Sequence, residues 1–257
     1  MTPIALFGVF YLPLADFRWF MGAIVVIGAW EFANLSGMKA QWQRILYAIA
    51  VGVTLWVSSF VAPVWILSAG VVWWLLALAW VLSYPSSSNQ WHFIRWFIGF
   101  AVLVPAWVGL VVLKGLPHGN YLILYVLVLV WGADVGAFFA GRTWGKRKLA
   151  PSVSPGKSWE GVWGGLACTS IVAFFVSLYL ELALKDASIW LLMSVVTVFA
   201  SVLGDLAESM LKRHAGVKDS SQLLPGHGGF LDRIDSVTAA MPVFTLVWLT
   251  LDWGFLA

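Results

Sequence analysis

The sequence has few charged residues for its length. Only 11% of its 257 residues are Asp, Glu, Lys or Arg, whereas a typical soluble domain has about 25%. A soluble protein of this size needs a polar surface over its apolar core, and so few charged side chains cannot supply one. Hydrophobic residues make up 61% of the chain and recur in runs from end to end. This composition excludes an ordinary soluble enzyme and indicates that the lipid bilayer is the main solvent.

Cysteine and several other features are also scarce or absent. The single Cys168 excludes a disulfide within the chain and a cluster of thiolate metal ligands. The formal charge of +3 is too small to indicate a nucleic-acid partner. The N-terminus lacks the basic region and the small-residue pattern of a secretory signal, so we expect no cleaved signal peptide. No internal repeat is visible, which argues against the two related halves of many secondary transporters.

The chain does contain a series of apolar segments long enough to cross a bilayer, which takes about 17 to 25 residues in a helix. The candidates lie near 4–15, 18–36, 44–61, 64–84, 93–114, 121–140, 160–183, 188–211 and 236–256. The first is too short to cross fully, and Pro63 should break the helix between the third and the fourth. The pattern predicts an all-α protein, a polytopic bundle of about nine transmembrane helices.

The positive charges lie mostly on one side of this predicted topology. Twelve of the 15 Lys and Arg residues fall in or beside the loops that follow even-numbered segments, and only Arg18, Lys114 and Lys185 fall on the other side. Basic loops stay on the cytoplasmic side of a bacterial inner membrane. We therefore expect a multi-pass inner-membrane protein whose two long loops, 141–159 and 212–235, share the cytoplasmic face.

Most of the acidic residues also fall on the predicted cytoplasmic side. A carboxylate in or beside the membrane is costly and is therefore a functional candidate. Asp205, Glu208 and Lys212 are spaced so that they share one face of a helix, and Asp232 and Asp235 repeat this spacing at the start of the ninth segment. Carboxylates from two helices can hold Mg²⁺. The alternative is that Glu208 and Lys212 form an ion pair that merely ends a helix.

The loop between these acids is basic and rich in glycine. It reads Lys-Arg-His-Ala-Gly-Val-Lys-Asp over 212–219 and Pro-Gly-His-Gly-Gly-Phe over 225–230. Glycine lets backbone amides come close to an anion, and the basic residues supply positive charge for it. We interpret the loop as a phosphate-binding segment. His227 could be a proton donor to a leaving phosphate or a hydrogen-bonded loop histidine.

The other long loop follows Asp134 of the sixth segment and is also basic. Its run of charge at 146–148 can be a topology signal or a patch for anionic lipid. Residues 154–158, Ser-Pro-Gly-Lys-Ser, resemble half of a P-loop, but the glycine spacing is wrong and no strand is expected before it. We reject a soluble nucleotide-binding fold and keep Lys157 and Ser158 as candidate phosphate contacts.

Three groups of residues in the second half of the chain match the motifs of one enzyme family. They are Ser-Met-Leu-Lys-Arg at 209–213 with Lys-Asp-Ser-Ser-Gln-Leu-Leu-Pro-Gly-His-Gly-Gly-Phe-Leu-Asp-Arg-Ile-Asp at 218–235, Ser-Pro-Gly-Lys-Ser-Trp-Glu-Gly at 154–161, and Asp134 with Gly141, Arg142 and Gly145. Together these motifs resemble those of phosphatidate cytidylyltransferases. Before about residue 130 only the hydropathy and Ala29-Trp30-Glu31 are similar, and the basic start of the first helix is missing.

The resemblance implies an all-helical, Mg²⁺-dependent membrane enzyme of phospholipid biosynthesis, often a homodimer among membrane lipids. The phosphate of phosphatidic acid would attack the α-phosphorus of CTP, giving CDP-diacylglycerol and pyrophosphate. The metal ligands would be Asp205 and Asp232 with Asp235 close by, a second cation being left open. Lys212 and Arg213 would take part in catalysis beside them. The residues implied as substrate contacts are Asp134, Arg142, Lys157, Ser158, Glu160, Glu208, Lys218, Asp219, His227, Gly228, Gly229 and Arg233.

Two other functions stay open from the sequence. A CTP-dependent polyprenol or phytol kinase would also need basic loops and buried acids, but it would yield CDP instead of pyrophosphate. An ion-coupled transporter would need acids at the midplane and on both sides, whereas these acids gather near one face. For the transferase, we expect residues 1–120 to be a membrane scaffold with dimer contacts and residues 121–257 to carry catalysis.

Overall fold

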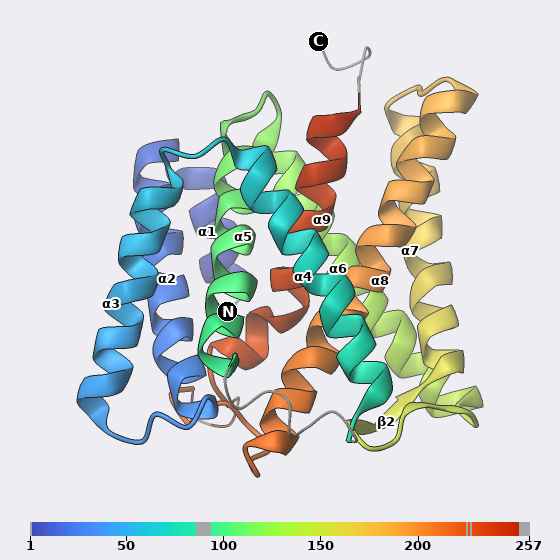
Figure 1. Ribbon diagram of the computed structural model, residues 1–257. Helices are drawn as coiled ribbons and strands as arrows, with labels where there is room; N and C mark the ends of the chain where they lie inside the picture. Colours follow the sequence, from blue (N-terminus) through green and yellow to red (C-terminus); the bar gives the residue numbers. More distant parts are fainter. Residues whose placement is uncertain (1, 86–93, 225, 227, 252–257) are drawn as a thin grey trace.

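The computed structural model describes residues 2–85, 94–224, 226 and 228–251, and within them it shows a helical bundle with one short sheet (Figure 1). The helices are α1 (Thr2–Tyr11), α2 (Leu14–Leu35), α3 (Gln41–Ser58), α4 (Pro63–Ser83), α5 (Arg95–Gly115), α6 (Gly119–Trp144), α7 (Trp159–Tyr179), α8 (Leu184–His214) and α9 (Leu231–Thr250). Strands β1 (Lys148–Ala150) and β2 (Ser154–Ser158) form an antiparallel hairpin between α6 and α7. The predicted all-α bundle is confirmed.

Five of the described helices, α4 to α8, are long and apolar enough to cross a membrane. Helices α2 and α9 are also long, but α2 carries charged residues near both ends and α9 carries them near its start. Helix α1 has only 10 residues. At about 1.5 Å per residue it reaches roughly half of a bilayer core about 30 Å thick, so it is too short to cross, as expected. The total of nine spans stays a prediction.

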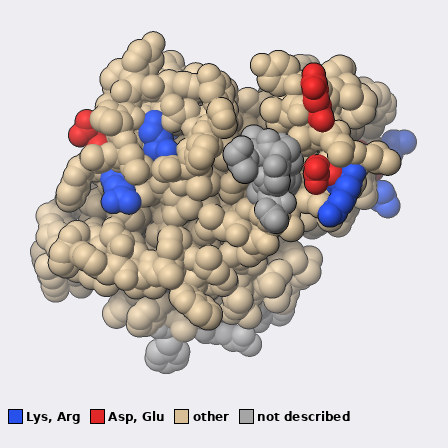
Figure 2. Space-filling model, turned by 90° about the horizontal axis from the view of Figure 1, so that it is seen from above, with Lys and Arg blue, Asp and Glu red and all other residues tan. Residues whose placement is uncertain are grey.

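The basic residues gather at one end of the bundle. The lower end in Figure 1 carries the β hairpin, the turn at 36–40 and the loop at 215–230. Twelve of the 15 Lys and Arg residues belong to these connections or to the helix ends beside them. The opposite end shows only scattered charges among uncharged side chains (Figure 2). The structure therefore groups the charges as the alternating topology requires, and the cytoplasmic placement of this end stays a prediction.

Small residues let neighbouring helices approach closely near this end. A Cβ atom on Gly204 of α8 would lie 2.5 Å from the carbonyl oxygen of Asp235 on α9. A Cβ atom on Gly165 of α7 would lie 2.8 Å from the carbonyl oxygen of Ala133 on α6. Glycine at such contacts is common where membrane helices pack without a hydrophobic driving force. These two contacts set the spacing of the helices that carry the predicted site.

Both long loops are shorter than the sequence indicated. Helix α6 continues to Trp144, and the rest of the predicted loop 141–159 is largely the β hairpin. Helix α8 continues to His214 and α9 begins at Leu231, so the connection between them is 215–230 instead of 212–235. The hydropathy pattern ended each segment at its first charged residues. The helices continue past those residues because polar side chains at the end of a span are still compatible with helical backbone.

The apolar core is shared between the two halves of the chain. One buried cluster joins Leu103 of α5, Ala207 of α8 and Ala239 of α9. A second cluster joins Val126 of α6 with Phe244 of α9. The first 120 residues thus support the helices that carry the predicted site, while the functional division at residue 120 stays a prediction.

Candidate active site

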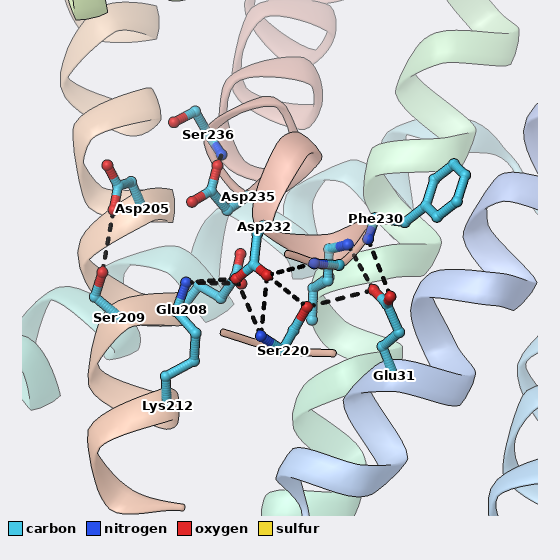
Figure 3. Close-up of polar contacts among 12 residues, drawn as sticks. Glu31, Asp205, Glu208, Ser209, Lys212, Ser220, Phe230, Asp232, Asp235 and Ser236 are labelled. Carbon is cyan, nitrogen blue, oxygen red and sulfur yellow. Dashed lines mark hydrogen bonds and ion pairs between the residues drawn. The ribbon is translucent and has the colours of Figure 1, made fainter. Parts of the chain in front are cut away.

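The acidic residues in the last third of α8 and at the start of α9 lie beside each other (Figure 3). The two helices run in opposite directions and are in close contact at Gly204. Asp205 and Glu208 of α8 therefore come next to Asp232 and Asp235 of α9. The structure brings together the two acidic stripes that the sequence spacing placed on two separate helices.

Asp232 is fixed by four donors from three residues. Lys212 Nζ lies 2.7 Å from its Oδ1 atom, and Gly229 N donates to Oδ2 at 2.8 Å. Ser220 donates twice to Oδ2, from its backbone N at 3.0 Å and from its Oγ at 2.9 Å. Four donors, one of them a charged ammonium, hold the carboxylate in a single orientation. The side chain of Asp232 is only 8% exposed.

Lys212 is shared by two carboxylates. Besides its contact with Asp232, its Nζ lies 3.2 Å from Glu208 Oε1. Glu208 is buried, and among the described residues neither of its oxygens accepts a hydrogen bond. The short distance and the lack of a hydrogen bond are compatible, because opposite charges attract even where the angle at the Lys212 ammonium does not suit a hydrogen bond. The Glu208–Lys212 pair is therefore present, but it belongs to a larger charged group and leaves acceptor capacity on Glu208.

Asp205 joins the β hairpin to helix α8. Lys157, which lies in β2, places its Nζ 2.5 Å from Asp205 Oδ2. Ser209, one turn further along α8, donates to Asp205 Oδ1 at 3.2 Å. The ion pair thus links the hairpin after α6 to the end of α8, two segments far apart in the sequence.

The donor chemistry of these acids fits Mg²⁺. Asp235 interacts electrostatically with Asp205 across the contact between α8 and α9, and its Oδ1 accepts a hydrogen bond of 2.6 Å from the next backbone amide. The carboxylates of Asp205 and Asp235 carry like charges, and the oxygens of Glu208 nearby accept no hydrogen bond in the described part of the chain. Such a group of oxygen atoms favours the binding of a hard divalent cation.

Lysine side chains neutralise two of the predicted metal ligands in this structure. Lys157 pairs with Asp205, and Lys212 pairs with Asp232. Within the described part of the chain no three Asp, Glu, His or Cys side chains converge as ready metal ligands. The assignment of Mg²⁺ to Asp205, Asp232 and Asp235 therefore stays a prediction that rests on donor type and position.

A pocket of about 390 Å³ lies beside the ion pair, between α6, α7 and α8. The predicted substrate contacts on its wall are Asp134, Arg142, Lys157 and Ser158. The rest of the wall includes Gly141, Gly156 and the apolar Val162, Val198 and Val202. The pocket thus combines charged groups from the basic end of the bundle with an apolar wall from membrane-spanning helices.

Two predicted substrate contacts have clear roles within the fold. Ser158 is the N-cap of α7, and its Oγ accepts a hydrogen bond of 3.2 Å from Gly161 N. Glu160 accepts hydrogen bonds of 3.1 Å from the backbone amides of Lys146 and Arg147 and lies 3.6 Å from the Arg147 guanidinium. Both residues hold the ends of the β hairpin, and their contact with substrate stays a prediction.

The glycine pair of the 215–230 loop does bring backbone close to anions, but these anions are side chains of the protein. A Cβ atom on Gly228, whose φ is +80°, would lie 2.7 Å from Asp232 Oδ2. A Cβ atom on Gly229 would overlap Ser220 Oγ and lie 2.6 Å from Glu31 Oε1. Glycine is needed here because only a residue without a side chain leaves room for the two carboxylates.

The remaining predicted contacts do not line the described part of the pocket. Arg213 donates from its Nε to the carbonyl oxygen of Val153 at 3.3 Å, which ties α8 to the hairpin. Lys218, Asp219 and Arg233 have exposed side chains. His227 lies outside the described residues.

Glu31 of α2 is the member of this site that the sequence prediction left out. It is fully buried. Its carboxylate accepts hydrogen bonds from Phe230 N at 3.0 Å, from Leu231 N at 2.7 Å and from Ser221 Oγ at 2.5 Å. The available signal was that Glu31 is one of only two acids in the first 120 residues and lies within an apolar segment. Its partners lie about 190 positions further along the chain, so sequence spacing could not reveal them.

Comparison with known proteins agrees with the resemblance of the motifs. The model of a family described as "Cytidylyltransferase family" matches residues 1–251. A protein of Pseudomonas aeruginosa named phosphatidate cytidylyltransferase is 51% identical over 99% of this chain and 95% of its own length. Proteins of the same name from Haemophilus influenzae and Staphylococcus epidermidis are 43% identical over 95% of this chain and 39% identical over 65% of it, covering 92% and 65% of their own lengths. The chain therefore belongs to the cytidylyltransferase family.

Proposed function

We propose that this chain transfers the cytidylyl group of CTP to phosphatidate and releases pyrophosphate. The membership of the family and the names of the similar proteins support this activity. The structural observation that carries the proposal is the ion pair between Lys157 and Asp205. It joins Lys157 of the 154–161 motif to Asp205, a predicted metal ligand on α8. Lys157 also lies on the wall of the pocket that holds Asp134 and Arg142.

In the proposed reaction, an oxygen of the phosphatidate phosphate attacks the α-phosphorus of CTP. The bond between the α-phosphorus and the oxygen bridging to the β-phosphate breaks, and pyrophosphate leaves with that electron pair. The attacking phosphate is already an anion near neutral pH, so no side chain has to remove a proton. Positioning and neutralisation of charge therefore supply most of the catalysis.

The basic residues of the site suit the binding of phosphate groups. Lys157 and Arg142 lie on the wall of the pocket and would bind phosphate oxygens of the substrates. Lys212 would hold Asp232 in place through their 2.7 Å contact. When Lys157 turns to a phosphate, Asp205 loses its cationic partner and becomes available as a ligand. Mg²⁺ bound by Asp205, Asp232 and Asp235 would neutralise charge on the phosphates.

The proposal includes the location and assembly of the protein. The helical bundle would span a bacterial inner membrane. The end of the bundle with 12 of the 15 basic residues would face the cytoplasm, where CTP is available. A homodimer is proposed from the resemblance of the motifs alone. Light scattering of the detergent-solubilised protein would measure its mass, and a monomer would contradict this part.

The decisive experiment measures products from purified protein supplied with CTP, phosphatidate and Mg²⁺. The wild type should form CDP-diacylglycerol and one pyrophosphate for each turnover, whereas a lipid kinase would form CDP. Asp232→Asn should lower the rate by roughly a hundredfold or more, because a neutral amide is a poor Mg²⁺ ligand. The control is Asp186→Asn in the first turn of α8, at the other end of the bundle, which should keep the wild-type rate. Near-normal turnover by Asp232→Asn would reject the proposed role of this residue.

A further inference from the structure

Glu31, in the first part of the chain, contacts the start of α9, which carries the proposed metal ligand Asp232. It lies on α2, whereas Asp205 and Asp232 lie on α8 and α9. We infer that Glu31 is a positioning residue for cytidylyl transfer, which fixes the carboxylate of Asp232 through Ser220. This inference rests on the proposed role of Asp232, and Glu31 itself would touch neither substrate nor metal.

The contacts of Glu31 are those of a fixed negative charge at the start of a helix. The backbone N–H groups of Phe230 and Leu231 donate to its two oxygens at 3.0 and 2.7 Å. The first amides of a helix lack partners within the helix, and its N-terminus is electropositive, so a carboxylate stabilises it. In most helices this acceptor is the N-cap side chain. Helix α9 has no side-chain cap of its own, because Phe230 occupies that position, and Glu31 takes this role from another helix.

One residue separates Glu31 from Asp232. Ser220 is buried, and its Oγ lies 2.9 Å from Asp232 Oδ2 and 3.4 Å from Glu31 Oε2. The dashed contacts in Figure 3 run from Glu31 through Ser220 to Asp232 and on to Lys212. Glu31 thus holds both supports of Asp232. It accepts from the first turn of α9, which carries Asp232, and from the hydroxyl of Ser221, next to the serine that donates to Asp232.

Loss of the Glu31 carboxylate should therefore alter the orientation of Asp232. Without the carboxylate, the N–H groups of Phe230 and Leu231 and the hydroxyl of Ser221 lose their acceptor, and donors left unsatisfied away from water are costly. The start of α9 and the 220–221 segment would then shift to find other partners. A displacement of about 1 Å at a reacting centre can lower a rate by roughly a hundredfold. The main effect should therefore fall on turnover and on Mg²⁺ dependence, and CTP binding should change little.

The test compares Glu31→Gln and Ser220→Ala with the wild type. Glu31→Gln keeps the size of the side chain but replaces one acceptor oxygen by an NH₂ donor. It should lower kcat roughly tenfold to a hundredfold and raise the Mg²⁺ concentration for half-maximal rate, with KM for CTP within about twofold. Without substrates, Mg²⁺ should also raise the unfolding temperature of the variant less than that of the wild type. Ser220→Ala should act in the same direction, and the double variant should lose much less than the product of the two single effects.

The matched control is Asn34→Ala on the same helix. Asn34 accepts a hydrogen bond of 2.6 Å from Arg44 Nη2 and does not contact α9 among the described contacts, so its loss should leave kcat and Mg²⁺ dependence unchanged. Wild-type kcat and Mg²⁺ dependence in Glu31→Gln and Ser220→Ala, with an inactive Asp232→Asn, would overturn this inference alone. A lower unfolding temperature with unchanged kcat for each folded molecule would also overturn it. If Glu31→Gln does not fold, Ser221→Ala decides, because Ser221 donates to Glu31 at 2.5 Å and has no described hydrogen bond to Asp232; wild-type kcat and Mg²⁺ dependence in this variant would then overturn the inference. An active Asp232→Asn would instead reject the proposed function of the site.

Discussion

The two connections that meet at the candidate site are held in different ways. The 145–158 connection is a β hairpin whose strands pair with each other and whose ends are fixed by Glu160 and Ser158. Among its described residues, the 215–230 loop has one isolated bridge, between Leu224 and Gly228. Its middle and its end donate hydrogen bonds to carboxylates on two helices, Asp232 and Glu31. The hairpin therefore keeps much of its shape from local contacts, whereas the loop takes its shape from the acids of the site. We expect substitutions at the loop positions that touch these acids to lower kcat more than substitutions in the hairpin do.

The largest effect is expected from Gly229→Ala, which breaks the contact of the loop with the acids. The added methyl group would overlap Ser220 Oγ and press on Glu31, so Asp232 would lose its support. We expect kcat to fall by roughly a hundredfold, measured as pyrophosphate release by purified protein.

The control for this change is Gly216→Ala in the same loop. Gly216 has a φ of +72°, but a Cβ atom there meets nothing within 4 Å. Backbone strain alone should lower the unfolding temperature and leave kcat close to wild type. Equal losses of kcat in both variants would show that any disturbance of the loop, and not contact with the acids, explains the effect of Gly229→Ala.

A smaller effect is expected from Glu160→Gln, which loosens the start of the hairpin. The neutral side chain would hold the Lys146 and Arg147 amides less firmly, so Lys157, at the same end of the hairpin on strand β2, would be positioned less well. We expect kcat/KM for CTP to fall roughly three- to tenfold, because charge-assisted hydrogen bonds become neutral ones. Glu181→Gln, at the opposite end of the bundle, should match the wild type. A loss as large as that of Gly229→Ala would contradict the comparison of the two connections.

The smallest effect is expected from Ser158→Ala, which removes the N-cap of α7. Loss of such a cap costs about 1 kcal/mol of stability, so the unfolding temperature in detergent should fall slightly while KM for both substrates stays within about twofold. Ser188→Ala, which removes only an exposed hydroxyl on α8, should change neither quantity. A clear rise in either KM would instead show that the Ser158 hydroxyl contacts a phosphate.

The sequence predicted the helices well because their signal is local. A run of apolar residues marks a membrane helix wherever it occurs, and the break at Pro63 was also visible. The helix ends were placed less well. Predicted segments 188–211 and 236–256 missed the polar turns of α8 and α9 that carry Lys212 and Asp232, because hydropathy falls at charged residues while the backbone stays helical.

The site was predicted in part, and the reason is the distance along the chain between its members. The spacing of Asp205 and Glu208, and of Asp232 and Asp235, follows from one helix at a time. The pairing of Lys157 with Asp205 and the contacts of Glu31 join residues 48 to 200 positions apart. Neither could be deduced from spacing. The hairpin was missed because both strands are short and β2 contains proline and glycine, which are rare in strands.

The place of Glu31 in the chain has a consequence for biogenesis. The ribosome makes α2 early. The backbone amides that donate to the Glu31 carboxylate belong to the last eighth of the polypeptide. A nascent chain that has inserted most of its helices therefore still lacks a finished catalytic centre. The catalytic centre can be completed only when α9 has entered the membrane, so truncated products that end before α9 should be inert.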